Sequence, residues 1–290
     1  MQILITGAYG QLGSEINELK EMFGDWSFLF TDVDSLDITS DDAVQEYFDS
    51  HKIDFVVNCA AYTAVDKAET EQKTADLVNA VAPKILAKQC KLIGAKLIHV
   101  STDYVFAGDA CTPYTESDKT NPQGVYGTTK LDGERFILSE NPDSIIIRTA
   151  WLYSSFGNNF VKTMLRLGKE KDELGVVFDQ VGSPTYAADL AEAILQVVNR
   201  TTVDQNNFIP GIYHYSNEGA ISWFDFAKAI FELSGIKIKV NPVLSDQFPT
   251  PAKRPHYSVL NKSKIRDKFE LKIPYWKDSL QVCLNRIEKA

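Results

Sequence analysis

The stretch that decides the fold is Gln2-Ile-Leu-Ile-Thr-Gly-Ala-Tyr-Gly-Gln-Leu-Gly13. Its beginning is short and mostly apolar, which predicts a buried β-strand, and residues 14–23 predict a helix. Glycines between a strand and a helix allow a tight turn. They let the backbone approach a pyrophosphate, whose charge the helix N-terminus favours. The spacing Gly-x-x-Gly-x-x-Gly is a weak signal by itself, and a plain strand-to-helix turn is the alternative.

The alternation of strand and helix continues along the chain. Strands are predicted at residues 27–32, 54–58, 95–101 and 144–148, and helices at residues 41–50, 74–93 and 125–139. This order predicts an α/β fold, a doubly wound parallel sheet of Rossmann type with helices on both faces. The pattern loosens near residue 150, where we expect a boundary to a smaller part that caps the sheet. Helices there are predicted near residues 159–168, 187–199, 222–233 and 276–287.

Composition narrows the classes of function. The chain has 290 residues and a net charge of −9, which argues against a nucleic acid or an anionic membrane as partner. The cysteines, Cys59, Cys90, Cys111 and Cys283, form no Cys-x-x-Cys pair, so free thiols in a reducing compartment are expected. We see no signal peptide and no apolar run of membrane-spanning length, so we expect a cytoplasmic protein.

An acidic residue follows the second predicted strand. Asp32 lies nineteen residues beyond Gly13, where a carboxylate can accept hydrogen bonds from the adenosine ribose. It would repel a 2′-phosphate, and the loop that follows adds Asp34 and Asp37 but no Lys or Arg. We therefore expect NADH to be accepted at least as readily as NADPH. A simple turn cap is the alternative for Asp32.

Two further segments are expected to lie along a dinucleotide. Asp37 and Ile38 are placed against the adenine. Small residues follow the third predicted strand in Asn58-Cys-Ala-Ala-Tyr-Thr63, and Ala61 falls at a strand end next to that of Gly10. Ligands of such sheets lie at the carboxyl ends of the strands, which favours a cofactor over packing of the next helix.

Three polar residues predict a hydride-transfer site. Thr102 ends the fourth predicted strand, and Tyr126 and Lys130 follow four residues apart, on one helix face. Thr102 can polarise a carbonyl, Tyr126 can donate a proton, and Lys130 can bind the nicotinamide ribose. The Lys130 ammonium is expected to lower the pKa of Tyr126 from its usual value near 10. A half-buried Tyr beside a solvated Lys is the alternative for an isolated Tyr-x-x-x-Lys pair.

Longer motifs resemble a known group of enzymes. Gly7-x-x-Gly10-x-x-Gly13 and Tyr126-Gly-x-x-Lys130 are similar to the extended short-chain dehydrogenase/reductases. Six stretches resemble one branch, the dTDP-4-dehydrorhamnose reductases: residues 10–13, 60–69, 101–106, 125–134, 148–153 and 179–185. The resemblance runs from residue 2 to about residue 195 and resumes at residues 249–255.

The resemblance implies a fold and a reaction. A dinucleotide-binding domain is expected at residues 1–150, about 174–210 and 243–272. A sugar-nucleotide-binding domain is expected at about 151–173, 211–242 and 273–290. The implied reaction is the NADPH- or NADH-dependent reduction of the C4 keto group of dTDP-4-dehydro-β-L-rhamnose, the last step of dTDP-rhamnose biosynthesis. Tyr126 would be the acid, Lys130 its partner and Thr102 the carbonyl-binding residue.

Further residues receive roles from the resemblance. Those expected to meet the dinucleotide are Gly7, Gly10, Gln11, Leu12, Gly13, Asp32, Asp37, Ile38, Ala61, Tyr62, Thr63, Tyr126 and Lys130. Thr102, Asp103 and Trp151 would meet the sugar, although a core Trp explains Trp151 nearly as well. Among the basic residues near the C-terminus, Arg254 is our choice for a diphosphate contact. Asn158 and Asn159 could bind substrate or cap the next helix.

Some members of the branch form homodimers bridged by Mg²⁺ that glutamates hold. Glu15 matches one such position, and Asp189 and Glu288 are further candidates. A solvent-exposed Glu15 on the first helix is the simpler interpretation.

Two other functions remain open. A regulatory module related to the methionine adenosyltransferase regulatory subunit would bind a dinucleotide without turnover. A nucleotide-sugar epimerase would return the hydride to its substrate.

Overall fold

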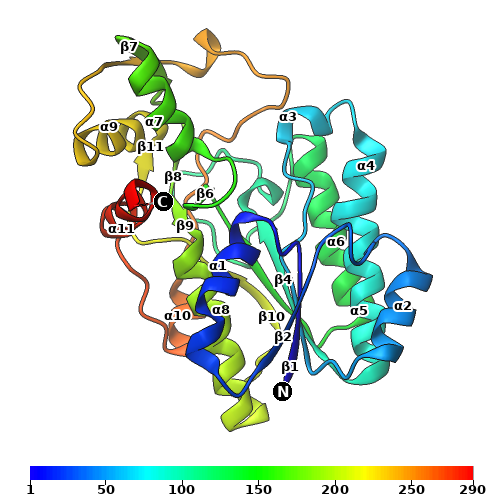
Figure 1. Cartoon of the computed structure of the whole chain (residues 1–290). Helices are drawn as coiled ribbons and strands as arrows, with labels where there is room; N and C mark the ends of the chain where they lie inside the picture. The colour runs from blue at the N-terminus through cyan, green and yellow to red at the C-terminus, as the bar shows by residue number, and fades with distance from the viewer. Residues whose placement is uncertain (290) are drawn as a thin grey trace.

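The computed structural model describes residues 1–289, and a six-stranded parallel sheet lies at its centre (Figure 1). The strands are β1 (Gln2–Thr6), β2 (Ser27–Thr31), β3 (Phe55–Asn58), β4 (Lys96–Thr102), β5 (Ile145–Thr149) and β10 (Gly211–His214). Their spatial order is β10-β5-β4-β3-β1-β2. The predicted α/β class and the first five strands are confirmed. The sixth strand, β10, was not predicted because its four residues carry no apolar run.

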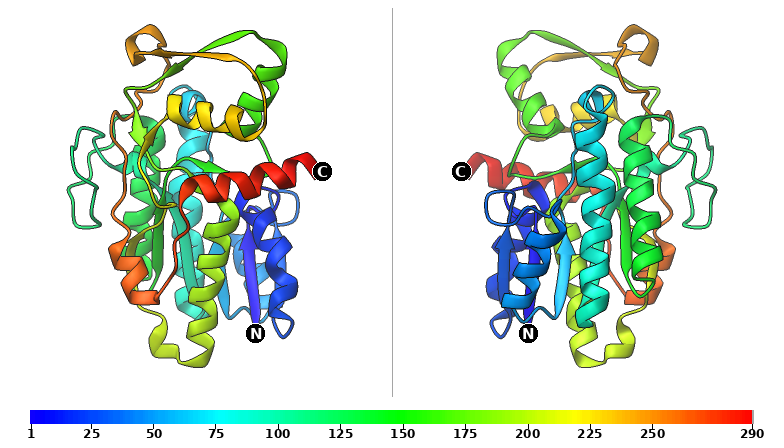
Figure 2. Two further views of the ribbon diagram at one scale, coloured as in Figure 1. Left: turned by 90° about the vertical axis from the view of Figure 1, so that its left-hand side faces the viewer. Right: turned by 90° about the vertical axis from the view of Figure 1, so that its right-hand side faces the viewer.

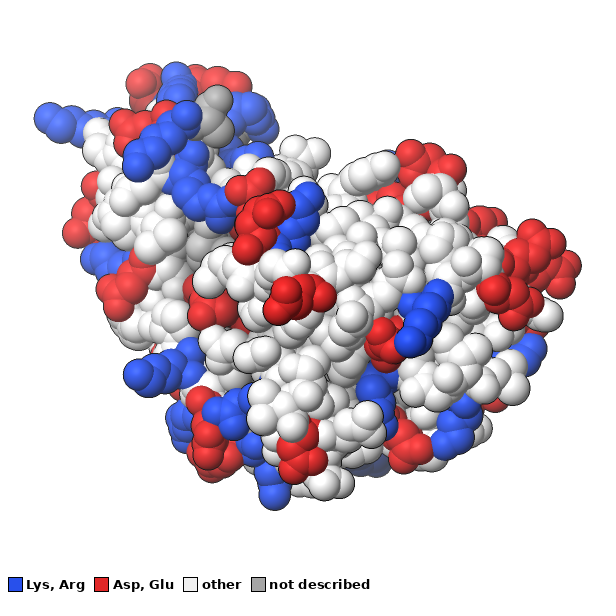
Figure 3. Space-filling model, turned by 60° about the horizontal axis from the view of Figure 1, so that its bottom comes forward, with Lys and Arg blue, Asp and Glu red and all other residues white. Residues whose placement is uncertain are grey.

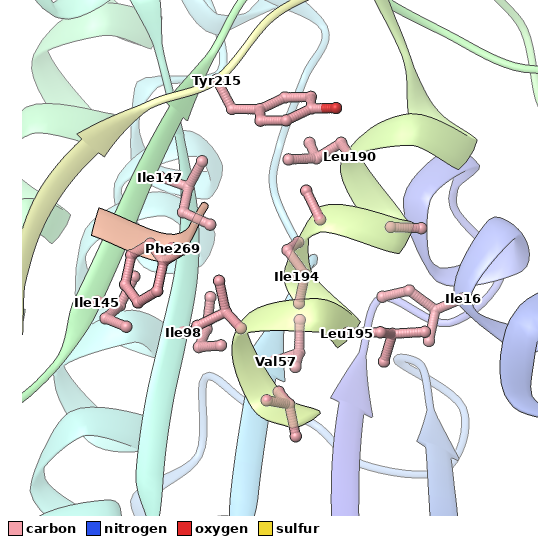
Figure 4. Packing of buried hydrophobic residues seen from close by; sticks show 14 of the residues in the cluster. Ile16, Val57, Ile98, Ile145, Ile147, Leu190, Ile194, Leu195, Tyr215 and Phe269 are labelled. Carbon is pink, nitrogen blue, oxygen red and sulfur yellow. The ribbon is translucent and has the colours of Figure 1, made fainter. Parts of the chain in front are cut away.

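Helices cover both faces of the sheet. One face carries α1 (Gln11–Leu19), α8 (Ala187–Val203) and α10 (Ser263–Phe269), and the other carries α2 (Asp41–Ser50), α5 (Ala82–Ile93) and α6 (Val125–Glu140). On the first face Ile98 and Ile147 of the sheet pack against Ile194 of α8 (Figure 4). The predicted helix at 74–93 is a continuous element made of α4 (Gln72–Asp76), a π-helical turn at Leu77–Val81 and α5.

A smaller lobe lies beyond the carboxyl ends of the strands (Figures 1 and 2). It contains α7 (Phe160–Glu170), α9 (Trp223–Leu233), α11 (Trp276–Lys289) and the parallel pair β7 (Glu173–Val177) and β12 (Lys239–Val243). Two short pairs connect it: β6 (Leu152–Tyr153) with β9 (Thr185–Tyr186), and β8 (Val181–Gly182) with β11 (Ile221–Ser222). Its core is a separate cluster that includes Phe226, Ile230 and Trp276.

The placement of two strands differs from the expected domain bounds. β10 was expected in the smaller domain, but it pairs with β5 at the edge of the main sheet. β7 was expected in the dinucleotide domain, but Leu174 and Val176 join the core of the smaller lobe, because β7 pairs with β12 there. Strand pairing, which unites segments far apart in sequence, decides both cases.

The topology creates a crevice at one point of the sheet. The chain leaves β1 toward β2 on one side and then crosses to β3 on the other side. The helices that follow β1 and β3 therefore diverge, and the carboxyl ends of β1, β3 and β4 border an open space.

The surface shows mixed charge. Acidic and basic side chains are interspersed on the face drawn in Figure 3. Within residues 1–289, no helix combines the length and apolar character that crossing a bilayer requires.

Candidate active site

A cavity of about 890 Å³ occupies the crevice between the sheet and the smaller lobe. Most of the residues that the sequence nominated line it: Gly7, Gly10, Gln11, Leu12, Asp32, Asp37, Ile38, Ala61, Thr63, Thr102, Asp103, Tyr126, Lys130, Trp151, Asn158 and Asn159. Gly13, Tyr62 and Arg254 lie outside this lining. The structure therefore brings together side chains from five strand ends and from the smaller lobe.

The glycine turn is shaped by close backbone contacts. Gly7 has a φ of +67°, and a Cβ there would lie 2.7 Å from the Ala60 backbone. A Cβ at Gly13 would lie 2.6 Å from the Ala8 Cα, so this glycine serves packing inside the turn. Between them the amide of Gly10 donates to the Gly7 carbonyl, and α1 begins at Gln11. The free amides at this helix start face the cavity, where they can bind a phosphate.

Asp32 and Asp37 hold the loop at one end of the cavity. One Asp32 carboxylate oxygen accepts from the amide of Tyr9 at 2.9 Å, and the other accepts from Val33 at 2.9 Å. Asp32 therefore caps the turn and also borders the cavity. The turn-cap interpretation and the cofactor interpretation made from sequence are thus compatible. Asp37 accepts from the amide and hydroxyl of Thr39, and these hydrogen bonds lower its pKa.

Tyr126 stands at the start of α6, with its ring edge against Tyr104 at 5.4 Å between centroids. Burial raises its pKa well above 10, and the neighbouring Thr102 hydroxyl acts in the opposite direction. The expectation that Lys130 lowers the pKa of Tyr126 was wrong, because burial dominates and Lys130 has no resolved effect on it. The Tyr126 hydroxyl is therefore fully protonated near neutral pH, which is the state that a proton donor needs.

Lys130 is buried against the sheet. Its ammonium donates to the Val100 carbonyl at 2.7 Å and lies 3.3 Å from Nε2 of His99. Burial lowers the pKa of Lys130 to about 8. The lysine is thus anchored to β4 at the cavity floor, and the solvated lysine considered from sequence is excluded by its 1% exposure.

Thr102 and Asp103 form the polar end of β4. The Thr102 hydroxyl donates to Asp103 Oδ1 at 2.9 Å and accepts from the amide of Tyr104. Asp103 Oδ2 is buried, and no partner meets strict hydrogen-bond geometry, but the Ser258 hydroxyl lies close enough to lower the pKa of the carboxyl. Burial outweighs this effect and raises the pKa of Asp103 to about 6.

Two tryptophans make an apolar wall. Trp151 has a φ of +48°, and its ring stacks on Trp223 with 3.6 Å between centroids. Both line the cavity. Sequence reasoning missed Trp223, because a Trp at a helix start carries no signal that separates a site residue from a core residue.

Arg254 and Tyr62 are held by partners beside the cavity. Arg254 forms an ion pair with Asp66 and donates to the Tyr104 hydroxyl at 3.1 Å. The Tyr62 hydroxyl donates to Glu71 at 2.6 Å. Arg254 reaches the site through Tyr104, which lines the cavity.

For Asn159 the structure shows the helix cap, which is one of the two roles that the sequence left open. Its side chain accepts from the amide of Lys162 and caps α7. Its amide group donates to Gln11 at 3.0 Å, which ties α7 to the glycine turn.

The candidate magnesium ligands do not fit a shared metal site. Glu15 is fully buried rather than exposed, and Arg286 of α11 pairs with it at 2.7 Å. Asp189 accepts from Asn217 and Ser279. Glu288 lies on the exposed surface of α11. Within residues 1–289, no group of three or more His, Cys, Asp or Glu side chains has the arrangement of a metal site.

A buried ion pair holds α6, the helix that carries Tyr126 and Lys130, against the sheet. Arg148 of β5 binds Glu134 of α6 through two hydrogen bonds, of 2.9 and 2.6 Å, and the Ser101 hydroxyl donates to the same carboxylate. All three side chains are almost inaccessible to solvent. This pair fixes α6 against β4 and β5, and so fixes Tyr126 and Lys130.

The fold and the site define a class of enzyme, the extended short-chain dehydrogenases/reductases. A glycine turn after β1, a strand-end Thr102 and the Tyr126–Lys130 pair on one helix meet in one cavity. The RmlD substrate binding domain family matches residues 1–289. The chain belongs to the dTDP-4-dehydrorhamnose reductase family.

Individual relatives agree over the whole length. The dTDP-4-dehydrorhamnose reductase of Aggregatibacter actinomycetemcomitans is 42% identical over 287 residues, 97% of each chain. A crystal structure of a dTDP-4-dehydrorhamnose reductase from Clostridium acetobutylicum has a TM-score of 0.93 and 47% identity, and the match covers 99% of this chain and 100% of that one. One from Bacillus anthracis, in complex with NADP, has a TM-score of 0.93 and 40% identity, with 98% and 99% covered.

Proposed function

We propose that this protein reduces the C4 keto group of dTDP-4-dehydro-β-L-rhamnose to give dTDP-β-L-rhamnose. The observation that carries the proposal is the convergence of Thr102, Tyr126 and Lys130 on one cavity whose other end is the glycine turn. Relatives named dTDP-4-dehydrorhamnose reductase supply the substrate class.

The residues divide the chemical work between them. When bound, NADPH or NADH supplies the hydride. When substrate binds, the Thr102 hydroxyl turns its proton from Asp103 Oδ1 to the substrate carbonyl oxygen and polarises it. Protonated Tyr126 gives its proton to that oxygen as the hydroxyl forms. Lys130 donates to the nicotinamide ribose while its contact with Val100 holds it in place. Each role uses a group that the structure already places at the cavity.

The sugar nucleotide is placed in the half of the cavity that the smaller lobe closes. Trp151 offers an apolar ring to the sugar, and Asp103, at the end of β4, is proposed to contact a sugar hydroxyl. Arg254 is proposed for the diphosphate, since its contact with Tyr104 keeps the guanidinium near the cavity rim. The division into a dinucleotide domain and a sugar-nucleotide domain follows the same two halves.

Cofactor choice follows from Asp32 and Asp37. Both carboxylates border the end of the cavity where the adenosine is proposed to lie, so a 2′-phosphate meets negative charge there. We propose that the protein uses NADH at least as well as NADPH. The relative from Bacillus anthracis was crystallised with NADP, so both cofactors belong in the assay.

Neither magnesium nor a second subunit is needed for the proposed chemistry. The Glu15 carboxylate is already neutralised by Arg286, so we propose that activity survives chelation of divalent ions.

The homodimer implied by resemblance remains a prediction, which sedimentation equilibrium can test. A cytoplasmic location is proposed from the four free thiols.

A cofactor-oxidation assay tests the function. Purified protein is incubated with dTDP-4-dehydro-β-L-rhamnose and NADPH or NADH, and the loss of reduced cofactor is followed by absorbance. Oxidation matched by dTDP-rhamnose formation is expected. Conversion of substrate without net oxidation would indicate an epimerase. Binding of cofactor with no conversion would indicate a regulatory module and would reject the proposal.

The Tyr126→Phe variant tests the proton donor. General acid catalysis contributes about 100-fold to 10,000-fold, so kcat is expected to fall by that factor. Cofactor affinity, measured by fluorescence titration, is expected to remain near that of the wild type, because the ring is kept. A variant that keeps most of its activity would show that another group donates the proton.

A further inference from the structure

Behind Lys130 lies a line of buried polar side chains that the proposed chemistry leaves unexplained. Thr6, Asn58 and His99 are register partners on the adjacent strands β1, β3 and β4. All three are at most 1% exposed. Thr6 and Asn58 end their strands, and His99 lies in the middle of β4. His99 ends the line against the Lys130 ammonium group.

The hydrogen bonds fix the orientation of Asn58. Its Oδ1 accepts from the Thr6 hydroxyl at 2.7 Å and from the backbone amide of Ala60 at 3.1 Å. A backbone amide can only donate, so the oxygen of the Asn58 side chain must face Ala60. The Nδ2 group therefore faces His99 Nδ1, at 3.0 Å.

The orientation of Asn58 fixes the tautomer of His99. The Asn58 Nδ2 group is a donor, so His99 Nδ1 must be the acceptor and carries no proton. The neutral ring then bears its proton on Nε2, and this N–H points at Lys130 Nζ, 3.3 Å away. The doubly protonated ring is disfavoured, because a proton on Nδ1 would oppose Asn58. In agreement with a neutral ring, burial and the nearby Lys130 lower the pKa of His99 well below 6.5.

The protonated and the neutral form of Lys130 interact differently with the His99 N–H. An ammonium has three donors and no acceptor, so it opposes the His99 N–H. A neutral amine keeps two donors, one of which serves the Val100 carbonyl, and offers a lone pair to His99. The hydrogen-bond donors and acceptors around Lys130 Nζ therefore match the neutral amine better than the ammonium.

We propose that the Thr6–Asn58–His99 line is a positioning device that turns an N–H toward Lys130 and favours its neutral amine. The neutral amine keeps one donor for the Val100 carbonyl and one for the ribose proposed to bind there, while its lone pair faces His99. His99 and Asn58 act through Lys130 and do not touch the substrate. The inference rests on the role proposed for Lys130.

Other groups around Lys130 do not reverse this effect. Glu134, one turn further on α6, and Cys59, which follows β3, both raise the pKa of Lys130. The charge of Glu134 is compensated by Arg148, and burial raises the pKa of the Cys59 thiol to about 12, so it is uncharged. Tyr126, on the cavity side, is protonated as well. Burial is the largest cause of the lowered Lys130 pKa. The effect proposed for the His99 N–H has the same direction.

Nuclear magnetic resonance tests the inference without turnover, so its result is distinguishable from failure of the proposed reaction. The ¹⁵N spectrum of the four histidines of the wild-type chain gives each tautomer, and the signal lost in His99→Gln identifies His99. A proton on Nε2 is expected. A proton on Nδ1, or on both nitrogens at pH 7, would overturn the proposal.

Titration of lysine labelled at ¹³Cε tests the effect on Lys130, whose signal is identified by its loss in Lys130→Arg. Asn58→Ala frees His99 to present its lone pair, so the pKa of Lys130 is expected to rise by roughly one unit, a tenfold change in equilibrium. His99→Phe removes the opposing N–H, and a rise is expected again. Asn217→Ala is the matched control, because Asn217 is equally buried but bonds to Asp189 and Ser279. An unchanged Lys130 titration in folded Asn58→Ala and His99→Phe would reject the proposal.

Discussion

A single buried carboxyl, that of Asp103, makes stability depend on pH. Its pKa is about 6 in the folded protein, against 3.8 in the unfolded chain, so the folded state binds the proton more tightly. The free energy of unfolding is therefore lower above pH 6 and rises as pH falls from about 6 to about 4. Two units of pKa correspond to about 3 kcal/mol.

Replacing Asp103 with Asn is expected to remove this dependence. The variant keeps an oxygen for the Thr102 hydroxyl and places an uncharged amide group next to the Ser258 hydroxyl, to which it can donate. At pH 8 it should be more stable than the wild type by about 3 kcal/mol, and at pH 4 the difference should shrink toward zero. Urea unfolding at both pH values measures it. An equal difference at both pH values would contradict the assigned pKa.

At the scale of elements, the packing of α6 against its neighbours decides where Tyr126 and Lys130 lie. Gly133 of α6 packs against the π-helical turn at Leu77–Val81, and a Cβ there would clash with the Asn79 carbonyl. Gly133→Ala is expected to push α6 outward, destabilise the protein by about 1–3 kcal/mol and reduce kcat. Gly24→Ala is the control, since a Cβ at Gly24 meets nothing within 4 Å. Equal stability of the two variants, measured by urea unfolding, would show that this contact does not constrain α6.

Elements also show what the sequence could reveal. The first five strands and the helices between them were predictable, because each apolar run is local, as in Gln2–Thr6. β10 was not, because its place beside β5 depends on a partner more than sixty residues away. The motifs located Thr102, Tyr126 and Lys130, but the hydrogen-bond partners of Lys130 depend on tertiary packing.

At the scale of the whole molecule, one ion pair joins the two parts of the fold. Arg286 of α11 reaches across to Glu15 of α1 and also donates to the Tyr186 hydroxyl at 3.0 Å. The Ser154 hydroxyl donates to the same carboxylate at 2.6 Å. Figure 2 shows α11 lying across the end of the sheet domain. The position of α11 therefore depends on a charge buried beneath it.

Removing one partner of this pair should cost more than removing both. Arg286→Met leaves the Glu15 charge buried and uncompensated, and a loss of about 3 kcal/mol is expected. The double variant Glu15→Gln, Arg286→Met should recover most of that loss, because no buried charge remains. Urea unfolding of both single variants and the double variant measures the coupling. The exposed pair Lys91–Asp143 serves as control, with less than about 1 kcal/mol expected for Lys91→Ala. Strictly additive losses would show that the pair is not coupled.

The same ion pair has a consequence for the order of folding. Arg286 lies 271 residues after Glu15 in the sequence. Closing a loop of that length costs more chain entropy than the local pairing of β1 with β2, so the contact is expected to form late. The Glu15 carboxylate is then desolvated in the same step in which its cation arrives, and the charge is never buried alone.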